Sequence, residues 1–439
     1  MAIMWSRIHV ELGLTAPTPL TYDMVAQAVT HRLRENEDLD WKQDLAWKKD
    51  LPPDVKAKKK AEFAKDVAAM ANTRGGLIVF GVRDENEEAA ELTGVENGER
   101  TRQSLRALAW QVRPLIEGLL IEALGADEGQ EGLIAVYVPP SPDAPHLVGE
   151  KNEMGVPYRY GTDTNWMSEG QLERAYRERF SRRADDRTTL GALIDGVLPE
   201  IDLTTGAWIA LAARPVAPLP LLSGSPDRAQ ATATMKRTLH LASELFGTEQ
   251  GRVATLNQLS AESVNNPRTG LRRWVIRSTP YAPDPHELSD WAWVELHHDG
   301  SIALAIELRA FLPSDNMLDE DTGVWHVPVR IVDAVIVEAI ALASTHVRGL
   351  GGVGTILTRA ALLRAESDQA PLIAIDGRSG GWTTSYFQRV EGSRSLRKPV
   401  AVEAEFSADD DVAALRAVAC QLADDIDQQF GIRASTIPG

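Results

Sequence analysis

The sequence predicts an α+β protein built from two folded domains, and three patterns support that prediction. Residues 56–71 carry apolar side chains at helical spacing, and the apolar run 77–82 that follows is typical of a buried strand. Further along, strand-like runs flank Asp299-Gly300, a pair that favours a tight antiparallel hairpin because both residues tolerate positive φ. The long apolar stretch 327–347 predicts a buried helix.

The domain prediction follows from these patterns and from chain length. A chain of 439 residues has room for about three domains of ~150 residues each. We expect an α/β domain over residues 1–185 and an α+β domain of unknown role, with an antiparallel hairpin and long helices, over 230–439. Between them, residues 186–229 read as a linker with a short helix and a Pro-rich loop, because four prolines fall within 215–226.

Each expected element follows from apolar spacing and from end signals such as Thr21 and Ser168, two side chains suited to capping helix N-termini. In the N-terminal domain we predict helices at 21–34, 56–71, 100–120 and 169–182, and strands at 39–43, 77–82, 133–138 and 156–159. In the C-terminal domain we predict helices at 230–246, 327–347 and 409–430, and strands at 272–277, 291–296, 301–308, 372–375 and 400–406.

Composition limits the class of protein. Hydrophobic residues make up 44% of the chain and charged residues 25%, as in ordinary globular proteins, and no apolar run reaches the ~18 residues of a membrane span. The first residues lack the pattern of a signal peptide, so a cytoplasmic location is expected. The single cysteine, Cys420, excludes an internal disulfide framework and a multi-cysteine zinc site.

Charge is unevenly distributed along the chain. The net charge is −17, which argues against a general nucleic-acid coat protein. Residues 42–65, however, hold eight lysines against four acids, a local +4, whereas residues 401–439 hold eight acids against two arginines, a local −6. A basic N-terminal stretch on an acidic protein favours a confined nucleic-acid groove, although a solvated lysine face on a surface helix is an equal alternative.

The strand predicted at 39–43 carries the first chemical signature. Alternation places Leu39 and Trp41 toward the core and Asp40 and Lys42 together on the opposite, exposed face. An acid two residues before a lysine is an arrangement used by metal-dependent nucleases. The carboxylate holds a divalent cation, and the lysine stabilises negative charge developing on phosphate.

The second signature is the end of the helix predicted at 56–71. Asn72, Thr73, Gly75 and Gly76 stop that helix, since Asn and Gly tolerate the left-handed conformation of a C-cap. Because this structural role explains the turn, nucleotide binding by the turn is the weakest of the functions that we consider for the chain. Asp84 lies just after the end of the apolar run, and functional side chains commonly lie at the ends of strands.

Three stretches together resemble the AlbA-like domain of the Schlafen family. They read ENEDLDWK at Glu35–Lys42, AMANTRGGLIVFGVRD at Ala69–Asp84 and VPYRYGTDTNWMS at Val156–Ser168. The family pattern is a Glu, an acid five residues later followed by aromatic-Lys, then A-x-A-N-T-x-G-G, an apolar strand, G-V-x-D, and finally R-x-G-x-x-T. The resemblance covers roughly residues 33–180, the N-terminal third of the chain.

The resemblance implies a site and an activity. Matched residue by residue, the acidic triad of the family falls on Glu35, Asp40 and Asp84, and its lysine on Lys42. In animal members these carboxylates form a metal-dependent endoribonuclease acting on tRNA and rRNA. The resemblance therefore implies a Mg²⁺- or Mn²⁺-dependent endoribonuclease acting on structured RNA, with a role in phage defence or stress response. Many bacterial members are described only as DNA-binding or ATP-binding regulators, so a non-catalytic DNA- or RNA-binding transcriptional regulator is the alternative.

Further residues are candidates for contacting nucleic acid. The lysines Lys48, Lys49 and Lys58–Lys60 would follow the backbone of a folded RNA. Arg159 and Thr164, in the R-x-G-x-x-T segment, would contact phosphate, with a structural ion pair as the alternative for the arginine. Another candidate is His146, although a histidine in a proline-rich loop is more often structural.

The chain departs from the family pattern at several points. Asp40 stands where Glu is usual, and a near-repeat six residues later would place Ala46 at the acid position. We prefer the first register because only it puts Glu35 five residues upstream. The animal proteins pair two such lobes in one chain and carry a cysteine-ligated zinc site, whereas this chain has one lobe and only Cys420. We therefore expect a homodimer.

Overall fold

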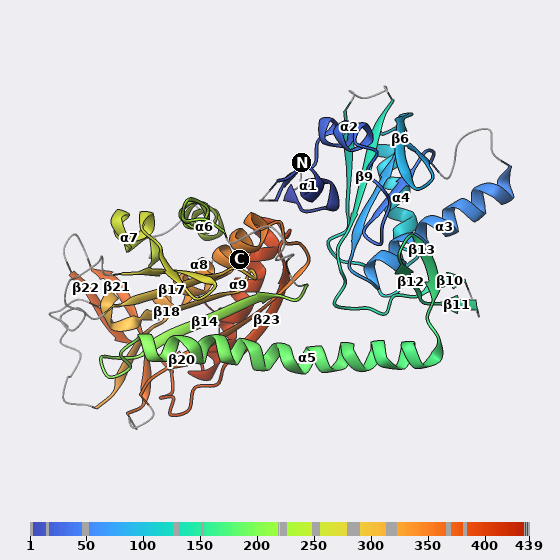
Figure 1. Ribbon diagram of the computed structural model, residues 1–439. Coiled ribbons are helices and arrows are strands. Elements are labelled where there is room, and N and C mark those ends of the chain that lie inside the picture. The colour runs from blue at the N-terminus through green and yellow to red at the C-terminus, as the bar shows by residue number, and fades with distance from the viewer. Residues whose placement is uncertain are drawn as a thin grey trace. The chain divides into compact units, whose positions relative to one another are not determined.

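The chain folds into two compact units in the computed structural model (Figure 1). The N-terminal unit comprises Met1–Asp185, Val216–Gly224 and Leu350–Gly354, and the C-terminal unit comprises the remainder. The predicted α+β class is confirmed. The structure describes residues 3–14, 17–45, 52–125, 131–150, 153–217, 219, 226–247, 255–278, 290–312, 323–365, 370–380, 384–433, 435 and 437.

A five-stranded sheet forms the centre of the N-terminal unit. Its main path runs β3 (Leu39–Lys42), β4 (Gly76–Phe80), β9 (Glu131–Val138) and β7 (Val95–Glu96), and β8 (Leu120–Leu124) also pairs with β9. β3 runs parallel to β4, whereas the other pairs are antiparallel. The parallel pairing brings the predicted acid-lysine strand beside the apolar strand that follows the helix stop.

Helices cover both faces of this sheet. On one face, α3 (Pro53–Ala71) and α4 (Glu99–Ala109) bury their apolar sides against residues such as Ile78. On the other, α2 (Tyr22–Thr30) packs in the cluster that holds Leu77. β4 is thus buried on both faces, as its nearly continuous apolar run predicts. The other elements of this unit are α1 (Arg7–Glu11), β1 (Ile3–Met4), β2 (Thr18–Pro19), β5 (Val82–Glu85), β6 (Glu88–Leu92), β10 (Val148–Glu150), β11 (Glu153–Gly155), β12 (Pro157–Tyr160) and β13 (Asp163–Trp166).

A seven-stranded antiparallel sheet forms the C-terminal unit. The predicted hairpin is present, with β17 antiparallel to β18 and Gly300 at a φ of 86° in the turn. In spatial order the strands are β15 (Arg268–Gly270), β16 (Arg273–Arg277), β17 (Ala292–His297), β18 (Ile302–Glu307), β14 (Trp208–Pro215), β20 (Thr355–Leu363) and β23 (Val402–Ser407).

Three helices pack on one face of the seven-stranded sheet: α6 (Arg228–Phe246), α8 (Val329–Gly349) and α9 (Val412–Gln429). Nearly all of α8 is buried, as its apolar sequence predicts. The opposite face is covered by the end of α5 (Glu169–Val197). The remaining elements are α7 (Ala261–Asn265), β19 (Trp325–Pro328), β21 (Leu372–Gly380), β22 (Thr384–Arg389), and the short 3-10 helices η1 (Leu198–Glu200), η3 (Leu256–Gln258) and η4 (Leu308–Phe311).

The linker predicted over residues 186–229 is wrong for most of its length. Helix α5 does not end near residue 182 but continues to Val197, because Leu190 and Ile194 bury against the sheet of the C-terminal unit. β14 then forms an inner strand of that sheet, paired on both sides by β18 and β20. Residues 186–215 therefore belong to the C-terminal core.

A second correction concerns the helix predicted at 100–120. It ends at Ala109, and the chain continues through the Arg113–Pro114 peptide. Pro114 cannot supply a backbone N–H to extend the helix, so the apolar spacing beyond it does not form a buried helical face. Accordingly, Leu115 is 51% exposed instead of buried.

No helix within the described ranges is long and apolar enough to span a membrane.

Candidate functional site

Strand β3 directs its alternate side chains as predicted, but Asp40, on the face opposite the core, is buried and not exposed. Leu39 and Trp41 pack in the core with α2, and Asp40 and Lys42 lie on the side of α3. Because α3 and β12 pack together over this side, Asp40 is only 4% exposed. The expected solvent-facing acid is therefore a buried one.

Two cations pair with the carboxylate of Asp40. Lys42 Nζ lies 2.8 Å from Asp40 Oδ2, and the Arg159 guanidinium lies 3.3 Å from Oδ1. Arg159 is itself buried, with 4% of its side chain exposed, and it also donates to the carbonyl of Thr162 at 2.8 Å. The structural ion pair that was the alternative for Arg159 is therefore present, whereas its contact with phosphate stays a prediction.

Asp66 is a member of this cluster that the sequence prediction missed. Its carboxylate lies 3.4 Å from Lys42 Nζ, and burial raises its pKa. Burial alone would lower the pKa of Lys42, but Asp40 and Asp66 more than offset this and raise it, so the lysine stays charged. The available clue was an acid among the buried residues Val67 and Met70 on the apolar side of α3.

Glu35 joins the cluster from the turn before β3. Its Oε1 accepts a hydrogen bond from the backbone N–H of Trp41 at 2.8 Å, which fixes the half-buried side chain. Burial raises the pKa of Glu35 to about 7, and the negative charges of Asp40 and Asp84 add to the increase. Asp84 itself is exposed and lies near the end of strand β5. Asp40 and Asp84 thus each lie within electrostatic reach of Glu35.

These acids fit a divalent cation only in part. Across the described part of the chain, no three His, Cys, Asp or Glu side chains form a ready-made metal cage. Mg²⁺ in proteins is usually held by one or two carboxylates, with water and substrate phosphate completing its shell. Since both oxygens of Asp40 face cations, Glu35 and Asp84 are the acids left to hold an ion.

The Asn72–Gly76 turn holds three segments together. Asn72 Nδ2 donates to the carbonyls of His146 and Pro157 at 2.9 and 2.7 Å, and its Oδ1 accepts from the His146 N–H at 2.6 Å. Thr73 Oγ1 accepts from the backbone N–H of Arg159 at 2.9 Å. The turn thereby fixes β12, and with it the arginine that neutralises Asp40.

The two glycines of this turn are required by geometry. Gly75 has a φ of +73°, and a Cβ there would lie 2.5 Å from the carbonyl oxygen of Val138. A Cβ on Gly76 would lie 2.9 Å from the carbonyl oxygen of Asp38. Asn72 has a φ of −76°, so the left-handed conformation belongs to Gly75 and not to Asn72.

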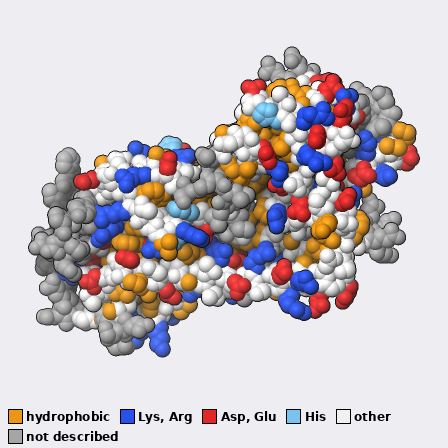
Figure 2. Space-filling view, viewed as in Figure 1, with side chains coloured by type: hydrophobic (Ala, Val, Ile, Leu, Met, Phe, Trp, Pro, Cys, Tyr) orange, Lys and Arg blue, Asp and Glu red, His pale blue; other side chains and the backbone are white. Residues whose placement is uncertain are grey.

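The lysines and the threonine predicted to contact nucleic acid lie on α3, on β13 or outside the described residues. Lys58 and Lys60 are exposed and Lys59 half-buried on α3, and Thr164 is half-buried on β13, whereas Lys48 and Lys49 lie outside the described residues. Figure 2 shows acidic and basic side chains intermixed over the viewed surface, without a broad basic patch.

His146 is fully buried, and its Nδ1 lies 2.8 Å from the carbonyl oxygen of Pro114. Burial lowers its pKa. A neutral, buried imidazole bonded to a backbone carbonyl cannot approach a phosphate, so the predicted contact is wrong and the structural alternative holds.

Comparison with known proteins identifies the class of the N-terminal domain. Residues 35–168 match the family model described as Schlafen, AlbA_2. The predicted Schlafen-type AlbA-like domain is therefore confirmed, and such a domain indicates a nucleic-acid-related function.

Solved structures add little to this assignment. The crystal structure of the DIP2311 protein from Corynebacterium diphtheriae is 16% identical, over 33% of this chain and 29% of that one, with a TM-score of 0.22. No curated protein matches the chain.

Proposed function

We propose that the N-terminal domain is a divalent-cation-dependent endoribonuclease acting on structured RNA. The observation that supports it is the grouping of Glu35 with Asp40 and Asp84, whose negative charges add to burial in raising the pKa of Glu35. A protein that only binds nucleic acid gains nothing from acids gathered beside phosphates, since like charges repel. A nuclease needs them to hold a cation.

In this proposal separate residues bind the cation, stabilise the charge on the phosphate and contact the RNA. Glu35 and Asp84 would hold Mg²⁺ or Mn²⁺, which when bound would polarise the phosphate and activate water. Lys42, kept charged by Asp40 and Asp66, would stabilise negative charge building up on the phosphate. The exposed lysines of α3 would contact the RNA backbone. A homodimer that supplies a second lobe remains part of the proposal.

A second candidate is binding of RNA or DNA without cleavage, as in a regulator. It is favoured by the pairing of Asp40 with both Lys42 and Arg159, which leaves only two of the three acids for a cation. In that case the cluster would stabilise the domain, and the lysines of α3 would provide the affinity.

Cleavage of total tRNA by the purified full chain with Mn²⁺ separates the two candidates. The test variant is Asp84→Asn, because Asp84 is exposed and its change should leave the fold intact. The matched control is Glu96→Gln, an exposed acid on β7 of the same domain. We expect discrete fragments from the wild type and the control, at least about 10²-fold less from Asp84→Asn, and none with EDTA. Uncut tRNA that is nonetheless shifted on a native gel would contradict the nuclease and favour the regulator.

A further inference from the structure

A cavity of about 530 Å³ lies within the N-terminal unit, in the size range of small-molecule sites. Part of its wall comes from the helix-stop turn, through Thr73, Arg74 and Gly76. The acids Glu35 and Asp84 do not line it, so the cavity is a second site of the same domain.

Two aromatic side chains give the cavity a flat apolar wall. Trp5 stacks on His9 with ring centroids 5.5 Å apart and an interplanar angle of 29°, which fixes the indole. Tyr137, on β9, is buried, and burial raises its pKa to about 12, so its hydroxyl stays a neutral donor. Among the described residues, no group hydrogen-bonds to this hydroxyl or to the indole N–H. A flat ring with hydrogen-bonding edges suits this wall.

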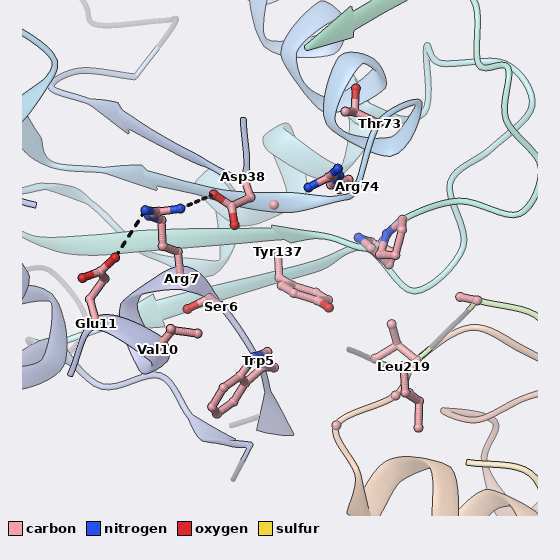
Figure 3. A pocket seen from close by; sticks show the side chains of 17 residues that line it. Trp5, Ser6, Arg7, Val10, Glu11, Asp38, Thr73, Arg74, Tyr137 and Leu219 are labelled. Atoms are coloured by element: carbon pink, nitrogen blue, oxygen red, sulfur yellow. Dashed lines mark ion pairs between the residues drawn. The ribbon is translucent and has the colours of Figure 1, made fainter. Parts of the chain in front are cut away.

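The charges of the cavity leave one cation available. Arg7 is balanced by two acids, with Glu11 at 3.3 Å and Asp38 at 3.7 Å. Arg74 is exposed and pairs with no acid among the described residues. Figure 3 shows Arg7 held between its two partners and Arg74 apart from them. An unpaired guanidinium at the cavity wall attracts an anionic group, and its planar donors match phosphate.

We propose that this cavity binds a nucleoside monophosphate, with the base against Trp5 and Tyr137 and the phosphate on Arg74. The volume, the aromatic wall and the single unpaired cation together fit one ring system carrying one phosphate. A free nucleotide and the 5′-phosphorylated end of a nucleic acid share this chemistry. The inference does not depend on cleavage by the acidic site.

Isothermal titration calorimetry of the full chain with AMP, GMP, CMP and UMP tests the proposal. We expect one site per chain for at least one nucleotide and at least about tenfold weaker binding in Arg74→Ala. The matched control is Arg100→Ala, which removes another exposed arginine of the same domain and should bind like the wild type. Tyr137→Phe, which keeps the ring, should weaken binding by a smaller factor.

Competition separates the two sources of the ligand. A short oligonucleotide with a 5′-phosphate that displaces the nucleotide, while its 5′-hydroxyl counterpart does not, would assign the cavity to nucleic-acid ends. Failure of both oligonucleotides would assign it to free nucleotides. The proposal is overturned if none of the four nucleotides binds, or if Arg74→Ala binds as tightly as Arg100→Ala.

Discussion

Two buried carboxyl groups, Asp40 in the N-terminal unit and Glu338 in the C-terminal unit, are stabilised in different ways. Asp40 in the N-terminal unit faces two cations, Lys42 and Arg159. Glu338 in the C-terminal unit, only 1% exposed, faces neutral donors instead. It accepts hydrogen bonds from the backbone N–H groups of Thr255 and Leu256 at about 3 Å and from the hydroxyl of Thr255.

The difference separates the cluster that we propose to be reactive from a structural one. Lys42 keeps 38% of its side chain exposed, pairs with the buried Asp40, and lies within electrostatic reach of the half-buried Glu35. Glu338 is enclosed between α8 and the start of η3, where neutral donors reach it, among them the Thr255 hydroxyl and the backbone N–H groups of Thr255 and Leu256. Burial raises the pKa of Glu338 to about 7 despite these hydrogen bonds. A buried acid paired with charged side chains near the surface is available to a proposed reaction, whereas one held by neutral donors in the core contributes to the fold.

The largest effect is expected from Asp40→Ala. It would leave the buried guanidinium of Arg159 without its carboxylate, and removing one partner of a buried ion pair costs about 3–5 kcal/mol. Urea unfolding of the full chain measures the loss. Asp163→Ala, an exposed acid on the neighbouring strand β13, serves as the control and should change the unfolding free energy little. Equal losses in the two variants would show that the Asp40 pair does not stabilise the unit.

A smaller, pH-dependent effect is expected at Glu338. Its pKa is raised from 4.5 to about 7 in the fold, so its protonated form stabilises the protein below about pH 4.5 and this contribution is lost as pH rises through about 7. The loss amounts to about 3 kcal/mol. Glu338→Gln removes the titration, so the variant should gain stability relative to the wild type between about pH 5 and about pH 9. A constant difference across that range would contradict this account.

Local sequence patterns predicted much of the N-terminal unit. The alternation in 39–43 placed Leu39 and Trp41 in the core, and the helix, turn and strand from 56 to 82 lie where spacing and end residues put them. These elements are determined by residues close in sequence, which a single chain displays directly. The hairpin at Asp299-Gly300 was predictable for the same reason.

The predictions that the structure corrects share a physical cause: they depend on contacts between residues that lie far apart in the sequence. Burial of Asp40 depends on Arg159, which lies over a hundred residues away, and strand alternation cannot say which helix will cover a face. Helix α5 has a weak apolar pattern, and only its last turns bury side chains such as Ile194 against a distant sheet. The role of Asp66 was visible only as an acid on an apolar helix face.

In the proposed site, Glu35 and Asp84 together hold a divalent cation. Titration of the full chain with Mn²⁺, followed by the loss of the free-ion electron paramagnetic resonance signal, tests it without relying on a chosen RNA. We expect binding by the wild type and by Glu96→Gln, and at least about tenfold weaker binding by both Glu35→Gln and Asp84→Asn. Undiminished Mn²⁺ binding in these two variants would contradict it.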